Sequence, residues 1–436
     1  MSKRNENRPG YKHTKVGWIP EEWCDAQFGT IVRFRNGLNF LKSHRGCKCR
    51  IIGVSSFQDY FEPQPDSFEE VELESQPTNE DLLAENDLLF VRSNGNKALI
   101  GRCLFMSHLH GQVSFSGFTI RARVFAKGVL PLYVALFFRT HGARREILAL
   151  GGGTNISNLS QSILGVVRIP LPPLAEQERI AEVLSAWDRV IALTDRLIAA
   201  KQCLKKGLMQ QLLTGRLRFP EFGKPARRRD ELPKGWDAKS LRSIAQVSFS
   251  GVDKKTHSDE MAVRLCNYMD VYGNSYITSG LNFMQATASA SEIASFSLRK
   301  GDVMITKDSE TPDDIGVPAV VTEDLENVVC GYHLALIRPN PEEADPIFLA
   351  KELASTRVAQ HFSTHANGAT RFGLSTAAVT KTRVHVPPIG EQRRIAATLY
   401  ACDCEIQLLT KKRDRLQKQK KGLMQKLLTG EVRIRN

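Results

Sequence analysis

The sequence contains few cysteines and no long apolar run, and both absences exclude broad classes of protein. Nine cysteines in 436 residues are too few for a disulfide scaffold, and neither Cys47/Cys49 nor Cys402/Cys404 has the C-x-x-C spacing of a zinc or redox site. No stretch approaches the ~18 uninterrupted apolar residues of a membrane span. The first residues are polar, so we expect no secretory signal, no membrane partner, and reduced thiols in a cytoplasmic protein.

The motifs of common catalytic sites are also missing. The sequence has no phosphate-binding loop of the form G-x-x-x-x-G-K-[ST], and Gly151–Gly153 opens no clear strand–helix–strand unit for a nucleotide or S-adenosylmethionine. Asp66, Glu72 and Glu74 resemble the carboxylates of a metal nuclease, but no lysine follows and the second half of the chain lacks the pattern. We therefore expect no catalytic residue, no metal site and no cofactor in this chain.

The charge balance is basic. Lys and Arg total 60 against 47 Asp and Glu, which gives a formal charge of +13. A positive chain fits a polyanionic partner such as nucleic acid, although charge alone is weak support. The hydrophobic content of 42% is enough to bury cores in roughly two to four domains.

The strongest feature is an internal duplication. The segment PPLAEQERIA at Pro172 recurs as PPIGEQRRIA at Pro387, 215 residues later. The segment KGLMQQLLTG at Lys206 recurs as KGLMQKLLTG at Lys421 with the same offset and nine of ten residues identical. Weaker similarities precede these motifs at nearly the same offset. The chain is therefore predicted to be two diverged globular segments of roughly 150 residues, each followed by a nearly constant segment of roughly 45.

Each constant segment has the pattern of one long amphipathic helix. Pro-Pro with acidic or amide residues favours a helix start, Thr-Gly suits its end, and no proline occurs between Pro173 and Leu213. Apolar residues spaced by three, four and seven predict a coiled-coil contact, and the two helices can pair antiparallel within the chain. The residues predicted at this helix–helix or partner contact are Ile180, Leu184, Trp187, Ile191, Leu208, Ile395, Leu399, Ile406, Leu409 and Leu423.

Two details of these helices stay open. Trp187 is either a seam residue or an anchor for a partner protein. Gly207 and Gly422 near the ends, where glycine costs ~1 kcal/mol relative to alanine, indicate either a close helix crossing or early fraying of the helix end.

The globular segments mix short apolar runs with Gly, Pro, Asn and Ser, which is typical of α+β domains. Their polar loops after apolar strands carry Arg, Asn, Ser, Thr and Lys, side chains that contact base edges or phosphates. Ordinary loop solvation is the alternative for any one of them. The candidate DNA-binding residues are Arg92, Ser93, Asn94, Asn96, Lys97, Thr154 and Asn155 in the first segment, and Lys307, Ser309, Thr370 and Arg371 in the second.

The chain resembles the specificity subunit of type I restriction–modification systems. The motifs are the P-P-x-x-E-Q-x-x-I-A segments at Pro172 and Pro387, the G-L-M-Q-x-L-L-T-G segments at Gly207 and Gly422, and the sequences IPEEW and LPKGW ahead of the globular segments. The resemblance covers nearly the whole chain. It implies an α+β fold with two similar target recognition domains joined by two long antiparallel coiled-coil helices, in a pseudo-two-fold internal repeat.

The resemblance also implies a division of the chain and of labour. The expected segments are a first recognition domain (1–170), a helical region (171–217), a linker (218–231), a second recognition domain (232–385) and a second helical region (386–436). The subunit would read a bipartite site in double-stranded DNA without being an enzyme. It would dock two modification subunits that methylate adenine, and restriction subunits that translocate DNA. S-adenosylmethionine, ATP and magnesium would bind in those partners.

Two alternatives come from other classes of protein. A stand-alone regulator would bind a bipartite DNA site tightly without partners. A nuclease would use Asp66, Glu72 and Glu74, and is the less favoured of the two.

Overall fold

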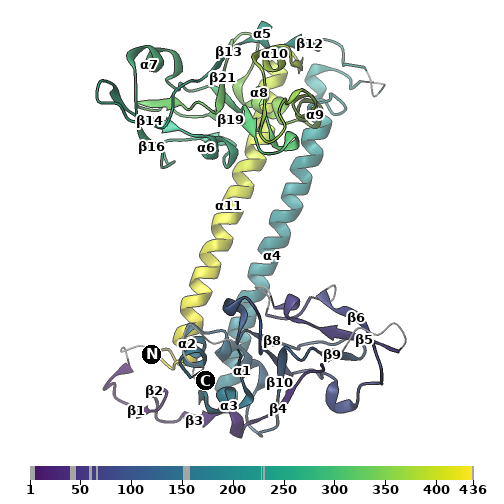
Figure 1. Ribbon diagram of the computed structural model, residues 1–436, viewed down its shortest axis with the longest axis vertical. Helices are drawn as coiled ribbons and strands as arrows, with labels where there is room; N and C mark the ends of the chain where they lie inside the picture. Colours follow the sequence, from purple (N-terminus) through teal and green to yellow (C-terminus); the bar gives the residue numbers. More distant parts are fainter. Residues whose placement is uncertain are drawn as a thin grey trace. The chain divides into compact units, whose positions relative to one another are not determined.

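The computed structural model describes residues 5–39, 46–57, 61–64, 67–150, 158–226, 228 and 231–434. The chain divides into two compact units, Met1–Thr194 with Lys412–Asn436, and Asp195–Lys411. Each unit contains one globular domain and parts of the same two long helices (Figure 1). The five segments expected from the sequence stay predictions, since the division into units crosses both helices.

The first domain is built on two sheets. One is four-stranded and antiparallel in the order β4-β10-β7-β8, and the other has the order β6-β5-β9 with β5 and β9 parallel. Two small antiparallel pairs, β1-β2 and β3-β11, lie outside these sheets. The bounds are β1 Tyr11–Thr14, β2 Gly17–Pro20, β3 Cys24–Gln27, β4 Val32–Asn36, β5 Cys47–Ile52, β6 Glu69–Leu73, β7 Leu88–Val91, β8 Cys103–Phe105, β9 Val113–Phe115, β10 Thr119–Val124, α1 Pro131–Phe138, α2 His141–Leu150, α3 Gln161–Val166 and β11 Arg168–Leu171.

The second domain repeats this plan. Its sheets have the orders β13-β21-β17-β19-β15 and β16-β14-β20, with β14 and β20 parallel, and its small pairs are β12-β23 and β18-β22. The bounds are β12 Asp237–Ser240, α5 Leu241–Ile244, β13 Ala245–Phe249, β14 Met261–Cys266, α6 Tyr268–Tyr272, β15 Tyr276–Ile277, β16 Met284–Ala288, α7 Ala290–Phe296, β17 Val303–Thr306, β18 Asp308–Ser309, β19 Pro318–Val321, β20 Val328–Cys330, β21 Leu334–Pro339, α8 Pro346–Leu353, α9 Thr356–His365, β22 Phe372–Gly373, α10 Thr376–Thr380 and β23 Arg383–Val386.

The 215-residue offset therefore extends into the diverged domains. Strand β7 begins at Leu88 and β17 at Val303, while α1 begins at Pro131 and α8 at Pro346. The sheet neighbours correspond as well, since β10 lies between β4 and β7 just as β21 lies between β13 and β17. The expected α+β fold with an internal repeat is confirmed.

Two long helices follow the domains, α4 at Leu174–Leu212 with 39 residues and α11 at Ile389–Leu428 with 40. In the first unit, Ile180 near the start of α4 packs in one hydrophobic cluster with Leu427 at the end of α11. In the second unit, Leu212 at the end of α4 packs with Ile395 near the start of α11. The helices therefore run antiparallel within each unit, as predicted.

Gly207 and Gly422 show neither feature that the sequence suggested. The helices continue past both glycines, to Leu212 and Leu428, so their ends do not fray early. A Cβ atom at either glycine would meet no heavy atom within 4 Å, which excludes a close crossing. Both suggestions were wrong because amphipathic spacing carries the helix through a residue of poor propensity.

Among the helices of the described residues, none combines the length and the apolar character of a membrane-spanning helix.

Candidate nucleic-acid interface

Three segments that are far apart in the sequence meet at the end of β7 in the first domain. The backbone N–H of Arg92 donates to the carbonyl oxygen of Phe118 at 2.8 Å, and the N–H of Leu159 donates to the carbonyl of Arg92 at 2.8 Å. Ser93 and Asn158 form an isolated β-bridge. The predicted loop of residues 92–97 thus lies beside residues 117–118 and 158–159.

The second domain builds the same junction at the end of β17. The N–H of Lys307 donates to the carbonyl of His333 at 3.0 Å, and the N–H of Leu374 donates to the carbonyl of Lys307 at 2.8 Å. Ser309 pairs with Phe372 across β18 and β22. In the same two strands Asp308 pairs with Gly373, 215 residues after Ser93 and Asn158. Lys307, His333 and Leu374 likewise lie 215 residues after Arg92, Phe118 and Leu159, so the two domains place equivalent loops together.

The predicted residues of the first domain have mixed surroundings. Arg92, Ser93 and Asn94 are half-buried, while Asn96 and Lys97 are exposed. The amide oxygens of Asn94 and Asn96 accept backbone N–H groups at 2.8 and 3.0 Å. These two asparagines therefore shape the loop in addition to any contact with DNA. Thr154 and Asn155 lie outside the described residues.

The predicted residues of the second domain divide in the same way. Lys307 is half-buried, with its Nζ atom 5.3 Å from the centre of the Phe249 ring, while Thr370 and Arg371 are exposed. Gly368 has φ of +147°, and a Cβ atom there would lie 1.8 Å from the carbonyl oxygen of Arg371. Only glycine fits this tight turn, which presents Thr370 and Arg371 to solvent.

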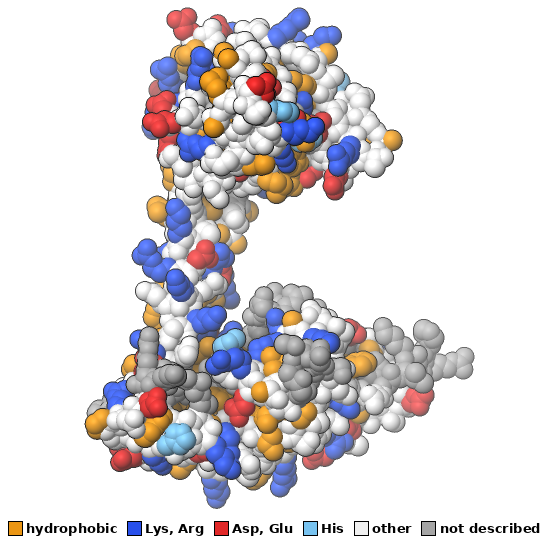
Figure 2. Space-filling model, turned by 60° about the vertical axis from the view of Figure 1, so that its left-hand side comes forward, with side chains coloured by type: hydrophobic (Ala, Val, Ile, Leu, Met, Phe, Trp, Pro, Cys, Tyr) orange, Lys and Arg blue, Asp and Glu red, His pale blue; other side chains and the backbone are white. Residues whose placement is uncertain are grey.

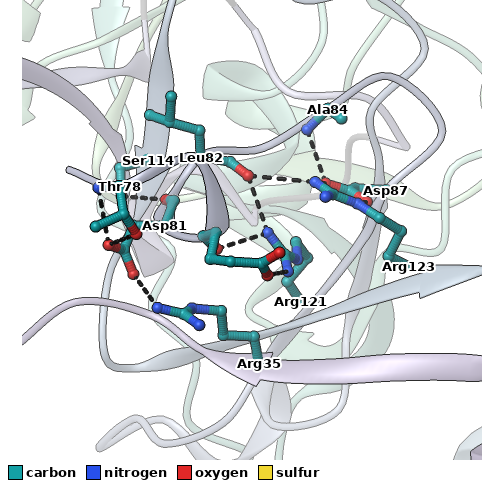
Figure 3. Close-up of polar contacts among 10 residues, drawn as sticks. Arg35, Thr78, Asp81, Leu82, Ala84, Asp87, Ser114, Arg121 and Arg123 are labelled. Carbon is teal, nitrogen blue, oxygen red and sulfur yellow. Dashed lines mark hydrogen bonds and ion pairs between the residues drawn. The ribbon is translucent and has the colours of Figure 1, made fainter.

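Several arginines are held by the fold itself. Arg123 on β10 forms two hydrogen bonds of 2.7 Å with buried Asp87, and Arg121 donates to the carbonyls of Glu80 and Leu82. Figure 3 shows these side chains, with Arg35, directed at the segment before β7. In the second domain, Arg338 and Asp302 make the equivalent pair with two bonds of 2.8 Å.

On the face that Figure 2 shows, Lys and Arg are scattered among acidic and apolar side chains. The basic surface is therefore not one continuous patch there.

A buried Trp–Glu–Arg cluster joins the second domain to both long helices. The carboxylate of Glu391, on α11, accepts two N–H bonds from Arg218 at 2.8 and 2.7 Å and one from Trp236 Nε1 at 3.0 Å. Both charged side chains are almost fully buried, and the bonds to Glu391 raise the pKa of Arg218. Because Arg218 follows α4, the cluster ties the end of one helix to the start of the other.

The first unit contains the same cluster from different parts of the chain. Glu176, on α4, accepts N–H bonds from Trp23 at 3.0 Å and from Arg433 at 2.7 and 2.8 Å. Arg433 follows α11. Three residues before it, the carbonyl oxygen of Gly430 accepts a hydrogen bond from the hydroxyl of Tyr11 at 2.6 Å. The segment after α11 is thereby fastened to the N-terminal region.

Two Asp–Lys pairs link the helices to each other. The residues of one pair are the counterparts of the other pair at the 215-residue offset. Asp188 on α4 pairs with Lys420 on α11, and Asp403 on α11 pairs with Lys205 on α4 at 2.5 Å. Asp403 also accepts hydrogen bonds from Tyr276 and Lys351 of the second domain, each at 2.7 Å. These pairs set the same antiparallel register in both units.

The sequence and the geometry agree with a family model described as a type I restriction modification DNA specificity domain, which matches residues 56–200 and 233–418. The chain belongs to this family.

The relatives match this specificity subunit over most of its length. The MjaVIII specificity subunit of Methanocaldococcus jannaschii is 22% identical, over 96% of this chain and 95% of its own length. The EcoKI specificity subunit of Escherichia coli K12 is 23% identical, over 87% and 82%. A chain from a study of complex assembly in a type I system has a TM-score of 0.58 with 17% identity, and covers 95% of this chain and 99% of that one. The specificity subunit from M. genitalium has a TM-score of 0.55 with 16% identity, over 93% and 96%.

The chain is therefore a non-catalytic subunit that recognises DNA sequence through two domains. These similarities do not favour the regulator or the nuclease. Glu72, on β6, and Glu74 are described, whereas Asp66 lies outside the described residues. No group of three or more His, Cys, Asp or Glu in the described part of the chain could hold a metal ion.

The residues predicted for the helix contact differ in burial along the specificity subunit. Fully buried positions lie near the helix starts, and those nearer the middle or the ends are half-buried. The buried residues are Ile180, Leu184, Ile395 and Leu399, and the half-buried ones are Trp187, Ile191, Leu208, Ile406, Leu409 and Leu423. The assignment of these residues to a coiled coil or a partner contact stays a prediction.

Two leucines on the long helices are conspicuously exposed. Leu193 on α4 is 61% exposed and Leu408 on α11 is 67% exposed. They differ in number by 215, so both copies of the helix present an apolar side chain at one position. The heptad pattern alone did not single out either residue, and only their exposure in the folded chain identifies them.

Proposed function

We propose that each domain reads one half of a bipartite target in double-stranded DNA, through the loops at the ends of β7 and β17. The observation that carries this proposal is that both domains assemble the same loops from equivalent positions but fill them with different side chains. Arg92, Ser93 and Asn94 in one domain correspond to Lys307, Asp308 and Ser309 in the other. Equal frameworks with unequal side chains suit two half-sites of different sequence.

The physical roles follow from the side chains. Exposed Lys97 and Arg371 contact phosphates, and this makes the affinity depend on salt. Asn96 and Thr370 are exposed near them and can hydrogen-bond to base edges, where a good bidentate pair contributes ~1–3 kcal/mol of discrimination. Thr154 and Asn155 remain candidates for the same role. The helices α4 and α11 fix the gap between the half-sites.

The helices also offer docking sites for the catalytic partners. Leu193 and Leu408 are exposed apolar residues at equivalent positions, which suits two copies of one partner, the modification subunit. That subunit would bind S-adenosylmethionine and methylate adenine, while restriction subunits would use ATP and magnesium. One structural relative comes from a study of complex assembly in a type I system, which supports such docking by analogy.

The test is an exchange of residues 20–170 for the equivalent segment of another family member. The methylome of cells that express the chimera with its partners should show one changed half-site, with the other half-site and the gap preserved. A chimera that changed both half-sites, or neither, would contradict the proposal. Adding whole turns to one long helix provides a second test, since only the gap should widen.

A further inference from the structure

Phe118 is an exposed aromatic residue at the loop junction of the first domain. Its side chain is 61% exposed, and it immediately precedes β10. Its carbonyl oxygen accepts the N–H groups of Arg92 at 2.8 Å and Ser93 at 3.3 Å. Within the described part of the domain, its ring belongs to no hydrophobic cluster. The backbone therefore fixes the position of Phe118 while the ring contributes little to the core.

A single exposed phenylalanine is not unusual on a protein surface, so the comparison between domains carries the argument. The counterpart of Phe118 in the second domain is His333, whose carbonyl accepts the N–H of Lys307 at 3.0 Å. The His333 Nδ1 atom lies 2.8 Å from Asp308 Oδ2, and its ring centre lies 3.7 Å from that of Tyr332. One backbone position thus presents an apolar ring in one domain and a held polar ring in the other.

We propose that Phe118 contacts a base of the half-site read by the first domain and helps to specify that base. An apolar ring can pack against a thymine methyl group or against the face of an unstacked base. His333 supplies hydrogen bonds at the equivalent place, so this position contributes to the difference between the half-sites. The inference rests on the proposed function, which assigns one half-site to each domain.

The chain offers a matched control in Phe125. This residue is 54% exposed and immediately follows β10, whereas Phe118 immediately precedes it. The six residues of β10 lie between them, so seven steps of extended backbone place the two Cα atoms roughly 23 Å apart. The Arg33 guanidinium lies 5.6 Å from the centre of the Phe125 ring. Phe125 therefore matches Phe118 in type and exposure but lies at the opposite end of the strand from the loops.

The experiment compares Phe118→Ala, Phe118→His and Phe125→Ala in the full chain with its partner subunits. Methylomes should show relaxed or altered specificity at one position of one half-site for both Phe118 variants, and the normal target for Phe125→Ala. Binding to the cognate duplex should weaken in Phe118→Ala, by roughly 5- to 150-fold for the loss of one base–aromatic stack. Replacing each thymine of that half-site by uracil removes the methyl groups and so distinguishes the two contacts. If the replacement weakens binding of the wild type but not of Phe118→Ala, the ring packs against a methyl group. If it weakens binding of neither protein, the ring stacks on a base.

Two results would overturn the inference. One is a Phe118→Ala methylome and affinity equal to those of Phe125→Ala. The other is equal weakening at both half-sites with a lower melting temperature, which would indicate a structural role. If the exchange of residues 20–170 changes one half-site but Phe118→Ala changes none, only this inference fails. If the exchange itself changes no half-site, the proposed function fails.

Discussion

Replacing Glu391 by glutamine removes the centre of a buried ion pair with little change in shape. The side chains of Glu391 and Arg218 are 1% and 2% exposed, and Arg218 makes two hydrogen bonds to this carboxylate. Glutamine removes the negative charge and turns an NH₂ group toward donors, so Arg218 keeps an uncompensated charge in the interior. Breaking a buried pair from one side costs about 3–5 kcal/mol.

This cost should appear as a lower melting temperature of the second unit, Asp195–Lys411. For a unit of this size, 1 kcal/mol corresponds to about 2–4 °C, so the transition should fall by roughly 6–20 °C. Differential scanning calorimetry of the full chain measures this shift. Removing both charges with Glu391→Leu and Arg218→Met should recover part of the loss, because an apolar pair leaves no buried charge.

The control is Glu70→Gln, which breaks the exposed pair of Glu70 with Lys48 at 2.9 Å. Water solvates both of these side chains, and no measurable shift is expected. A Glu391→Gln variant that melts at the same temperature as Glu70→Gln would refute the assignment of the Trp–Glu–Arg cluster as a stabilising junction.

Four other sets of contacts lead to predictions of their own. Burial raises the pKa of Glu352 to about 7, against the influence of Arg357, so the folded state holds its proton below that pH. The free energy of unfolding of the wild type, relative to that of Glu352→Gln, should therefore be highest below pH 4.5 and should fall by roughly 3 kcal/mol as the pH rises to about 7. Urea unfolding at several pH values measures this difference, and a difference that does not vary with pH would contradict the prediction. Asp403→Asn removes the partner of Lys205 and Lys351 and should lower the melting temperature more than Asp188→Asn, which affects Lys420 alone; equal shifts would argue against the shared role of Asp403. Gly207→Ala and Gly422→Ala fill open space on a helix and should each stabilise the chain by ~1 kcal/mol in chemical denaturation, whereas a loss would indicate a close contact after all. Leu193→Glu with Leu408→Glu should weaken co-purification of the modification subunit while leaving the melting temperature unchanged, and full retention of the subunit would exclude this docking surface.

The long helices could be read from the sequence because their determinants are local. Spacing of apolar residues, Pro-Pro at the start and Thr-Gly at the end act within a few turns, so α4 and α11 begin and end close to the predicted limits. Glycine is required after each helix because Gly215 and Gly430 have positive φ. A Cβ atom would also collide with Pro233 at Gly215 and with Pro20 at Gly430. The prediction failed at Gly207 and Gly422, where context outweighs residue propensity.

The candidate interface was only partly accessible from the sequence. Arg92 and Lys307 stood out because they follow buried strands, but their neighbours Phe118 and His333 join them only through sheet pairing. An alignment at the 215-residue offset relates Phe118 to His333, yet it gives no sign that either lies near the loops. Likewise, composition could not separate Lys97, which is exposed, from Arg123, which is held by Asp87.

By itself, the sequence determined that the molecule is a duplicated chain with two long helices and two diverged domains, because a repeat and a helical period are properties of residue order. Tertiary structure decided which parts meet. Arg218 binds Glu391 and Arg433 binds Glu176, so each helix end is fastened to the start of the other helix. No local signal specifies such a pairing, since it depends on the antiparallel packing of segments about 170 to 260 residues apart and on the burial that makes each charge require its partner.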